Sequence, residues 1–251
     1  MTGYAENSLV RGLSFLAEKQ AAIANNLANV NTTSFKRRMA VAADSGDQFH
    51  TLLNQRLSAV DFQQRSDLEV GAIRETGNRL DVALEGPQWL RVQDENGAQF
   101  YTRNGQLRFD ESEQADTGVL VNGDGLKLLD VNGQPITIQT GQGAPNDLAI
   151  SPNGTITNPN DNSQVGQLAL VELPNPQDLQ PVGRGLFTDP RAQEGAQAAD
   201  GLRQGALEGS NVDSLQELVA MITVERSFSA TQRVLKGVNQ LQENMITQML
   251  R

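Results

Sequence analysis

The two ends of the chain carry a helical pattern that its middle lacks. Over residues 7–30, apolar residues recur at alternating four- and three-residue steps. They are Leu9, Leu13, Leu16, Ile23, Leu27 and Val30, with Gln20 at the one polar step. This spacing is typical of the narrow seam of a coiled coil and not of the broader face of an ordinary globular helix. We therefore expect a helix whose seam packs on another helix.

The opposite end, residues 211–251, predicts a second long helix. Its start is indicated by Asp213 and by Ser214 with Glu217, which have the spacing of a capping box. Its seam, interrupted by Thr231 and Gln242, consists of Met221, Val224, Phe228, Leu235, Val238, Met245 and Met249. A second apolar set widens the seam into a face: Leu215, Leu218, Ile222, Val234, Leu241 and Ile246. Such a helix is expected to have partners on more than one side.

Between residues 71 and 209 the pattern changes to short stretches of alternating apolar and polar residues. LDVAL from Leu80, WLRVQ from Trp89 and QLALVEL from Gln167 are typical of strands. Turn signals separate these stretches, and repeated Asn-Gly pairs predict hairpins. The pairs begin at Asn96, Asn104, Asn122, Asn132 and Asn153. We therefore expect a mainly β domain inserted between the two helices.

Residues 36–70 are polar and predict an extended connector with one helical piece. The apolar spacing behind that piece comprises Phe49, Leu52, Leu53, Leu57 and Val60. The expected fold class is α+β, with a discontinuous coiled-coil domain of terminal helices (1–35 and 210–251) and a β domain over 71–209. Because each helix has an apolar stripe that the β domain does not cover, the helices are expected to pair with each other and with neighbouring copies. The chain is thus expected to be an assembling subunit.

Composition excludes several function classes. The formal net charge of −10 argues against a nucleic-acid partner, and the short basic run at residues 36–38 is interpreted as a solvated turn. The absence of cysteine rules out disulfides, a thiol nucleophile and thiolate metal sites. No apolar run approaches the ~18 residues that a membrane span needs. The first residues lack the charged and apolar regions of a secretory signal peptide, so we expect no cleaved leader.

We find no catalytic or metal-binding pattern. His50, the only histidine, lies in the polar connector and is interpreted as an exposed bystander. Asp81 and Glu85 fall on one face of a strand without the opposed environments of an acid–base pair. NPNDNS (residues 158–163) lacks the glycine and the final glutamate of a calcium loop. FYTRNG (residues 100–105) resembles a ligand patch, but a strand that ends in an Asn-Gly turn explains it equally well. The expectation is a protein that is not an enzyme and has no cofactor.

Several motifs resemble those of the flagellar axial proteins, the rod and hook subunits of the bacterial flagellum. ANNLANVNTTSFKR from Ala24 resembles the family's N-terminal signature, and LDVALEGPQWLRVQ its segment at the entry of the β domain. The stretch that opens YTRNGQLRF and the hairpin DLAISPNGTI resemble the next two segments. QGALEGSNVDSLQELVAMITVERSF resembles the C-terminal signature. The motifs stand in the family's order and cover nearly the whole chain.

The resemblance implies a structural protein of the flagellar basal body. In that family, subunits stack helically around a central export channel, with the terminal helices as an inner coiled-coil tube and the β domain outside it. Its implied partners are copies of itself, other rod proteins and the flagellar type III export apparatus, with no nucleic acid and no membrane insertion. The implied location is the rod that spans the periplasm and transmits motor torque to the hook.

Within the family, two features favour the proximal-rod type, with the distal-rod type as the alternative. Trp89 stands where the distal rod and hook proteins usually carry a Phe-rich turn, and the connector of residues 36–70 is short. One departure is Ser34, where many members have glycine. If that glycine serves a turn with positive φ, Ser34 must adopt the same conformation at some cost.

The N-terminal signature adds four residues to the apolar seams as expected assembly residues, namely Asn25, Asn26, Asn29 and Phe35. Asparagine is poor inside a helix, so three of them near a helix end need a reason. Asn25 and Asn29 are spaced as an i,i+4 pair that could fix helix register in a packed tube. The alternative is that they are solvated or simply end the helix. A more distant alternative for the whole chain is a secreted β-rich adhesin or glycan-binding module.

Overall fold

The computed structural model describes residues 2–43, 61–111, 117–139, 148–159, 162–191 and 195–249. It divides into two compact units. The helical unit consists of Met1–Val30, Arg38–Asp67 and Val212–Arg251, and the β unit of Asn31–Arg37 and Leu68–Asn211. The short segment Asn31–Arg37 therefore belongs to the β unit, although it lies between two parts of the helical unit in the sequence.

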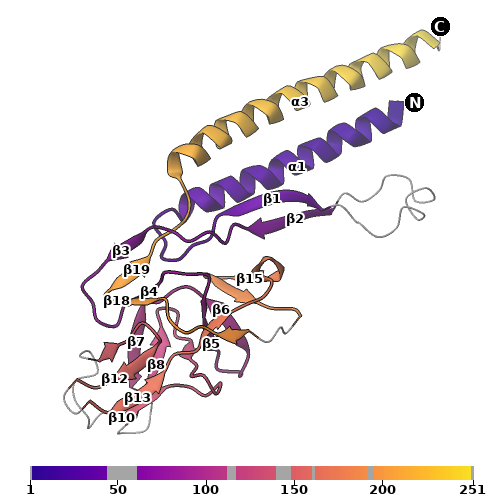
Figure 1. The fold of residues 1–251 in the computed structure, drawn as a ribbon. Coiled ribbons are helices and arrows are strands. Elements are labelled where there is room, and N and C mark those ends of the chain that lie inside the picture. The colour runs from indigo at the N-terminus through magenta and orange to yellow at the C-terminus, as the bar shows by residue number, and fades with distance from the viewer. Residues whose placement is uncertain are drawn as a thin grey trace. The chain divides into compact units, whose positions relative to one another are not determined.

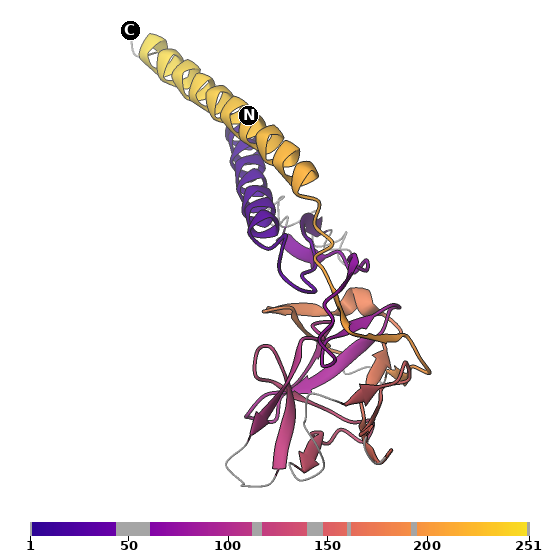
Figure 2. The same cartoon turned by 90° about the vertical axis from the view of Figure 1, so that its left-hand side faces the viewer.

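The helical unit contains the two long helices that the seam spacing predicts. Helix α1 spans Thr2–Ala28 and helix α3 spans Ser214–Met249. They lie side by side and run in opposite directions, so that both chain ends are at the same end of the pair (Figures 1 and 2). Ile23 on α1 and Val224 on α3, both seam residues, are buried.

The predicted connector forms a strand pair in its described part. Strand β1 (Arg38–Ala43) pairs antiparallel with β2 (Asp61–Ser66), and β1 packs against α1. The predicted helical piece, from Phe49 to Val60, lies outside the described residues, as does His50.

The start of α3 differs from the predicted capping box. The Asp213 carboxylate Oδ1 accepts hydrogen bonds from the backbone N–H of Leu215 at 2.9 Å and of Gln216 at 3.2 Å. Asp213 is therefore the N-cap, and Ser214 is the first helical residue. Glu217, expected to close the box, is instead completely buried.

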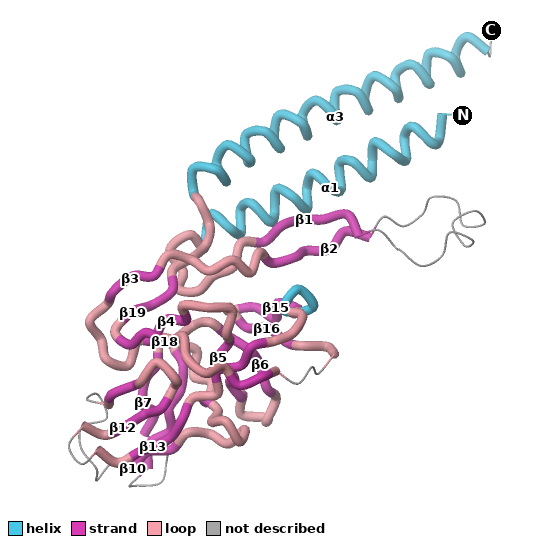
Figure 3. The backbone as a smooth tube through the Cα atoms, viewed as in Figure 1, coloured by secondary structure: helices cyan, strands magenta, loops and turns pink. Residues whose placement is uncertain are grey.

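The β unit confirms the prediction of a mainly β insertion (Figure 3). Its largest sheet in the described residues has the order β10-β8-β9-β5-β6-β16-β15, with β14 beside β5, β17 beside β14 and β7 beside β8. These strands are β5 (Trp89–Gln93), β6 (Gln99–Thr102), β7 (Leu107–Glu111), β8 (Thr117–Asn122), β9 (Lys127–Leu128), β10 (Thr137–Gln139), β14 (Leu170–Glu172), β15 (Gln180–Gly183), β16 (Leu186–Thr188) and β17 (Ala196–Gln197).

Smaller sheets complete the β unit. Strand β11 (Ala149–Ile150) pairs with β12 (Thr155–Thr157), which also pairs with β13 (Gln164–Gln167). Strand β3 (Ile73–Glu75) pairs with β19 (Ala206–Glu208), and β4 (Val82–Leu84) pairs with β18 (Leu202–Gln204). A short 3₁₀ helix, η2, spans Pro176–Asp178. The core is made by inward aliphatic side chains such as Val82, Leu84, Leu90, Leu128 and Ile156.

Four of the five Asn-Gly pairs turn the chain between antiparallel partners, as predicted. They connect β5 to β6, β8 to β9, Leu129 to its bridge partner Pro135, and β11 to β12. The prediction is wrong for the pair at Asn104, because β6 and β7 each pair with other strands. Gly105 serves a close approach there, since a Cβ atom on it would lie 1.9 Å from the Val82 carbonyl oxygen.

Candidate functional site

A buried ion cluster centres on Glu208 in the β unit. Lys36 Nζ lies 2.7 Å from Glu208 Oε1, and Arg103 Nε lies 2.7 Å from Glu208 Oε2. The backbone N–H of Gly71 donates a further hydrogen bond of 3.0 Å to Oε1. At most 2% of each of the three side chains is exposed. The interpretation of residues 36–38 as a solvated turn is therefore wrong for Lys36, because a carboxylate distant in sequence replaces water around its ammonium group.

Arg103 extends the cluster into the sheet. Its Nη1 donates to the carbonyl oxygens of Gly86 and Gln88, and its Nη2 donates to the carbonyl oxygen of Leu84. The guanidinium also lies over the ring of Trp89, 5.7 Å from the ring centroid. The stretch FYTRNG thus places in the core an arginine whose three guanidinium nitrogens all donate hydrogen bonds.

Ser34 connects the same cluster to the segment Asn31–Arg37. Its φ is 54°, so it adopts the left-handed conformation that a glycine would favour. Its Oγ donates a hydrogen bond of 2.7 Å to the Arg103 carbonyl oxygen, and its N–H donates one of 2.9 Å to the Glu208 carbonyl oxygen. The expected backbone cost of serine at this position is therefore offset by hydrogen bonds, of which only the one from Oγ needs the side chain.

Asn211 holds the other side of this segment within the β unit. Its side-chain Oδ1 accepts a hydrogen bond of 2.7 Å from the Arg37 N–H, and its own N–H donates to the Phe35 carbonyl oxygen. Phe35 itself is buried. The last residues before α3 and the first residues after α1 are thereby bonded to each other in the β unit.

A second buried polar group lies in the helical unit and explains one of the three asparagines. Asn26 Nδ2 donates to the Arg38 carbonyl oxygen at 2.9 Å and to Glu217 Oε2 at 3.2 Å, while Asn26 Oδ1 accepts from the Arg38 N–H at 2.7 Å. Asn26 and Glu217 are both buried. One amide therefore joins α1, β1 and α3.

The predicted register contact involves Asn25 and Asn29 and not Asn26. Asn29 Nδ2 does donate to the Asn25 backbone oxygen at 2.8 Å, which is the expected i,i+4 relation. A signal for Asn26 was nonetheless present in the sequence. Glu217 stands four residues before Met221, in step with the seam of α3, and a carboxylate at a seam position needs a buried donor.

The structure separates the apolar residues of the two helices by exposure. The narrow seams are buried or half-buried at Leu9, Leu13, Leu16, Ile23, Leu27, Val30, Met221, Val224, Phe228, Leu235 and Val238. The wider face of α3 is exposed at Leu215, Leu218, Ile222, Val234 and Leu241, and the seam residue Met245 is exposed with it. Side chains of Gln242, Ile246 and Met249 lie outside the described set. An assembly role for these residues stays a prediction.

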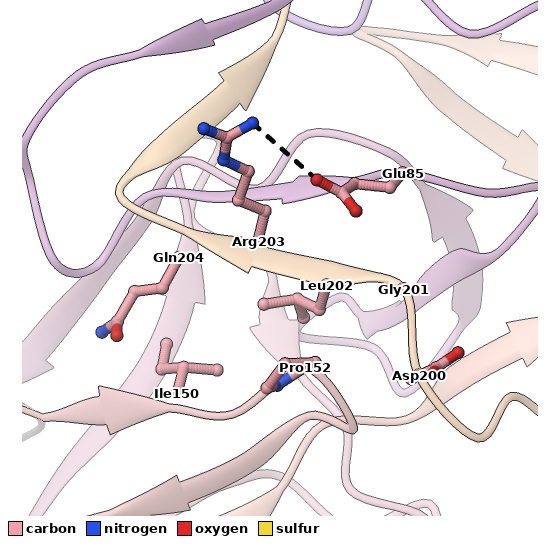
Figure 4. Close-up of a pocket in the computed structure, with 8 residues that line it drawn as sticks. All are labelled: Glu85, Ile150, Pro152, Asp200, Gly201, Leu202, Arg203 and Gln204. Atoms are coloured by element: carbon pink, nitrogen blue, oxygen red, sulfur yellow. Dashed lines mark ion pairs between the residues drawn. The ribbon is translucent and has the colours of Figure 1, made fainter.

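The β unit also contains an open cavity of about 510 Å³ between β18 and β11 (Figure 4). Its lining includes Glu85, Asp200, Arg203 and Gln204, and Arg203 Nη1 lies 3.9 Å from Glu85 Oε1. Asp81 is buried and accepts a hydrogen bond from Asn78, so it does not share an environment with the exposed Glu85. Among the described residues that line this cavity there is no serine, threonine or histidine.

The described ranges contain no group of three or more histidine, aspartate or glutamate side chains that could hold a metal ion. In the same part of the chain, neither helix has the length and apolar character that crossing a membrane requires.

Three family models match successive parts of the chain. Residues 7–36 match the model described as flagella basal body rod protein, and residues 83–158 match the flagellar hook protein FlgE/F/G D1 domain. Residues 203–249 match the flagellar basal body rod FlgEFG protein C-terminal model. These matches include Asn26, Lys36, Arg103, Glu208 and Glu217, the side chains that form the two buried polar groups.

Curated relatives match over most of their length. The flagellar basal-body rod protein FlgG of Agrobacterium fabrum is 30% identical over 246 residues, covering 87% of this chain and 89% of the relative. The flagellar hook-basal body complex protein FlhP of Bacillus subtilis is 31% identical, covering 91% and 93%. The flagellar basal-body rod protein FlgF of Salmonella typhimurium is 32% identical over 237 residues, covering 88% of each.

Proposed function

The chain belongs to the flagellar basal-body rod protein family, and we propose that it is a structural subunit of the rod that assembles through its two terminal helices. The observation that carries the proposal is the exposed apolar face of α3. Leu215 is 70% exposed and Ile222 is 50% exposed, although α3 already packs on α1. A large apolar face left open on a folded chain is typical of a protein–protein contact.

Within the family we propose the proximal-rod type, FlgF, with the distal rod protein FlgG as the alternative. Relatives of both names match at similar identity, 32% for a FlgF and 30% for a FlgG. The choice is therefore supported only by Trp89 and by the short connector of residues 36–70. The secreted adhesin alternative has no support from these relatives.

The proposed role is mechanical and not catalytic. Copies would stack helically around the export channel together with other rod proteins, in the part of the flagellum that spans the periplasm. The subunit would reach that place through the flagellar export apparatus. The buried clusters around Glu208 and around Asn26 suit a protein that bears mechanical load. In each cluster, charged or bidentate hydrogen bonds join segments that are far apart in the sequence.

The proposal is tested by placing a charge in a seam. Leu27→Glu and Leu235→Glu each put an unpaired carboxylate at a half-buried helix position, and we expect both to abolish incorporation into the rod. Asn239→Glu, at an exposed position of α3, is the matched control and should leave incorporation unchanged. The readouts are swimming of a complemented deletion strain and the presence of the chain in purified basal bodies. Normal motility of both seam variants would contradict the proposal.

A further inference from the structure

Three loops of the β unit share one hydrogen-bonding pattern. They begin at Asp94, Asn122 and Asp130, and the fourth residue of each is a glycine whose N–H donates to the carbonyl oxygen of the first. In each loop, the side-chain oxygen of the first residue accepts hydrogen bonds from the backbone N–H groups of the third and fifth residues. An asparagine at the first position adds an amide donor that an aspartate lacks. Asn122 is completely buried, and its Nδ2 has no hydrogen-bond partner among the described residues.

Asn122 also precedes a glycine, and this pair can lose the asparagine amide spontaneously. The backbone nitrogen of the second residue attacks Cγ of the asparagine, and glycine has no side chain to hinder that attack. The chain contains five Asn-Gly pairs, so the surroundings of each pair decide which one reacts. The reaction is favoured by a glycine N–H that is free to lose its proton, by donors on the asparagine Oδ1 and by an amide group that is free to leave.

The loop around Asn122 provides all three conditions. The Gly123 N–H donates no hydrogen bond to a described residue, and Gly123 is exposed to water. Oδ1 of Asn122 accepts hydrogen bonds of 3.0 Å from the Asp124 N–H and 2.9 Å from the Leu126 N–H. These two donors stabilise the negative charge that develops on Oδ1 during the attack, as an oxyanion hole does. The leaving group, Nδ2, is held by no acceptor in the described structure.

Each of the other four pairs lacks at least one of these conditions. After Asn96, Asn132 and Asn153, the glycine N–H donates to a backbone carbonyl oxygen and closes the turn. The Asn132 amide also donates to a carboxylate oxygen of its own loop at 3.0 Å. At Asn104, Oδ1 accepts a hydrogen bond of 3.2 Å from one backbone N–H, and the glycine that follows, Gly105, is buried.

We propose that Asn122 is a site of spontaneous deamidation. The Gly123 nitrogen gives its proton to hydroxide and bonds to Cγ of Asn122. The Cγ–Nδ2 bond then breaks, and the amide leaves as ammonia after it takes a proton from water. Water opens the resulting cyclic imide: opening at Cγ gives aspartate, and opening at the backbone carbonyl gives isoaspartate.

Aspartate at position 122 would fit the loop better than asparagine does. The loops that begin at Asp94 and Asp130 already have a carboxylate in the equivalent place. The new carboxylate would accept the same two backbone N–H bonds, which become stronger when the acceptor is charged. The buried donor without a partner would be lost at the same time.

Peptide mass mapping of the purified full chain tests the site. The chain is incubated in mildly alkaline buffer, and the fraction of each Asn-Gly pair that has lost its amide is measured over time. We expect Asn122 to react fastest in the folded chain, whereas all five pairs should react at similar rates in urea. Gly123→Ala is the matched control. Its added Cβ would lie 3.2 Å from the flexible end of the Gln106 side chain, so the fold is kept, but the methyl group should slow the reaction at Asn122.

Three results would overturn the inference. In the folded chain, a rate at Asn122 no higher than that at Asn96 would show that the loop does not promote the reaction. An unchanged rate in Gly123→Ala would exclude attack by the Gly123 nitrogen. Asn122→Asp should melt at the same temperature as the unaltered chain or at a higher one, and a lower melting temperature would show that aspartate does not fit the loop.

Discussion

Lys36 Nζ and Glu208 Oε1 lie 2.7 Å apart, with both side chains buried, although 172 positions separate them in the sequence. Arg103 occupies the second oxygen of the same carboxylate, so one anion is paired with two cations. The pair connects the segment after α1 to the strand that leads to α3, and it does so within the β unit.

Substitution of the two partners should have unequal effects. Glu208→Gln removes the buried negative charge that pairs with two buried cations, and we expect a loss of about 3–5 kcal/mol in the free energy of unfolding. Lys36→Met should be less destabilising, because Glu208 keeps Arg103 and the Gly71 N–H. Urea unfolding of the full chain measures both.

The control for this prediction is an exposed ion pair in the same unit. Arg203 pairs with Glu75, with 47% and 76% of the side chains exposed. Arg203→Met should therefore change the unfolding free energy by at most about 1 kcal/mol. Equal losses of unfolding free energy for Glu208→Gln and Arg203→Met would show that the buried cluster stabilises the chain no more than an exposed ion pair does.

Asn26→Ala should destabilise the helical unit. The change removes both hydrogen bonds to the Arg38 backbone and one donor to the buried Glu217 carboxylate. Since a buried polar group left unsatisfied costs about 1–3 kcal/mol, and more for a charged one, we expect a loss of at least about 3 kcal/mol. The measurement is thermal unfolding followed by far-ultraviolet circular dichroism. Asn31→Ala, at an exposed asparagine, should stay close to the unaltered chain, and an Asn26→Ala melt that matches it would be the contrary result.

Ser34 allows backbone strain to be separated from hydrogen bonding. Ser34→Ala keeps the positive φ but loses the Oγ hydrogen bond to Arg103, so we expect it to lose about 1–3 kcal/mol. Ser34→Gly loses the same bond but relieves the left-handed strain, worth about 1–2 kcal/mol. Equilibrium unfolding should therefore rank stability as serine first, glycine second and alanine last. An alanine variant as stable as the glycine variant would mean that the strain is absent.

Asp213, and not Ser214, should control the start of α3. Removing an N-cap side chain costs about 1 kcal/mol, so Asp213→Ala should lower stability by that amount. Ser214→Ala should be nearly neutral, because alanine is the better residue inside a helix. Urea unfolding curves of the two variants measure this difference. A larger loss of stability for Ser214→Ala than for Asp213→Ala would support the capping box predicted from the sequence.

Local patterns explain why the helices and the β insertion could be predicted. Seam spacing and Asn-Gly turns are properties of residues close together in the sequence, and both gave elements that the structure contains. The Asn104 turn was mispredicted because its geometry depends on Val82, which packs against Gly105 from another strand. The pattern of neighbouring residues in the sequence does not indicate a contact between residues this far apart.

The candidate site was less predictable for the same reason. Lys36 was assigned to solvent because its partners, Glu208 and Arg103, are remote in sequence and no local rule pairs them. Asn26 differs from Asn25 and Asn29 only in its helix face, because it lies one turn from the buried Ile23. A positive φ at Ser34 could be predicted from the glycine that many relatives have there. The two carbonyl oxygens that accept hydrogen bonds from Ser34 could not be predicted, because they belong to distant residues.

The central claim is that this chain is a rod subunit held in place by its terminal helices. An electron cryo-microscopy map of basal bodies purified from the organism that encodes it tests the claim most directly. We predict density for the chain within the rod, with α1 and α3 of each copy in contact with helices of neighbouring copies. A map in which the rod contains no copy of this chain, or in which both helices contact no neighbour, would contradict it.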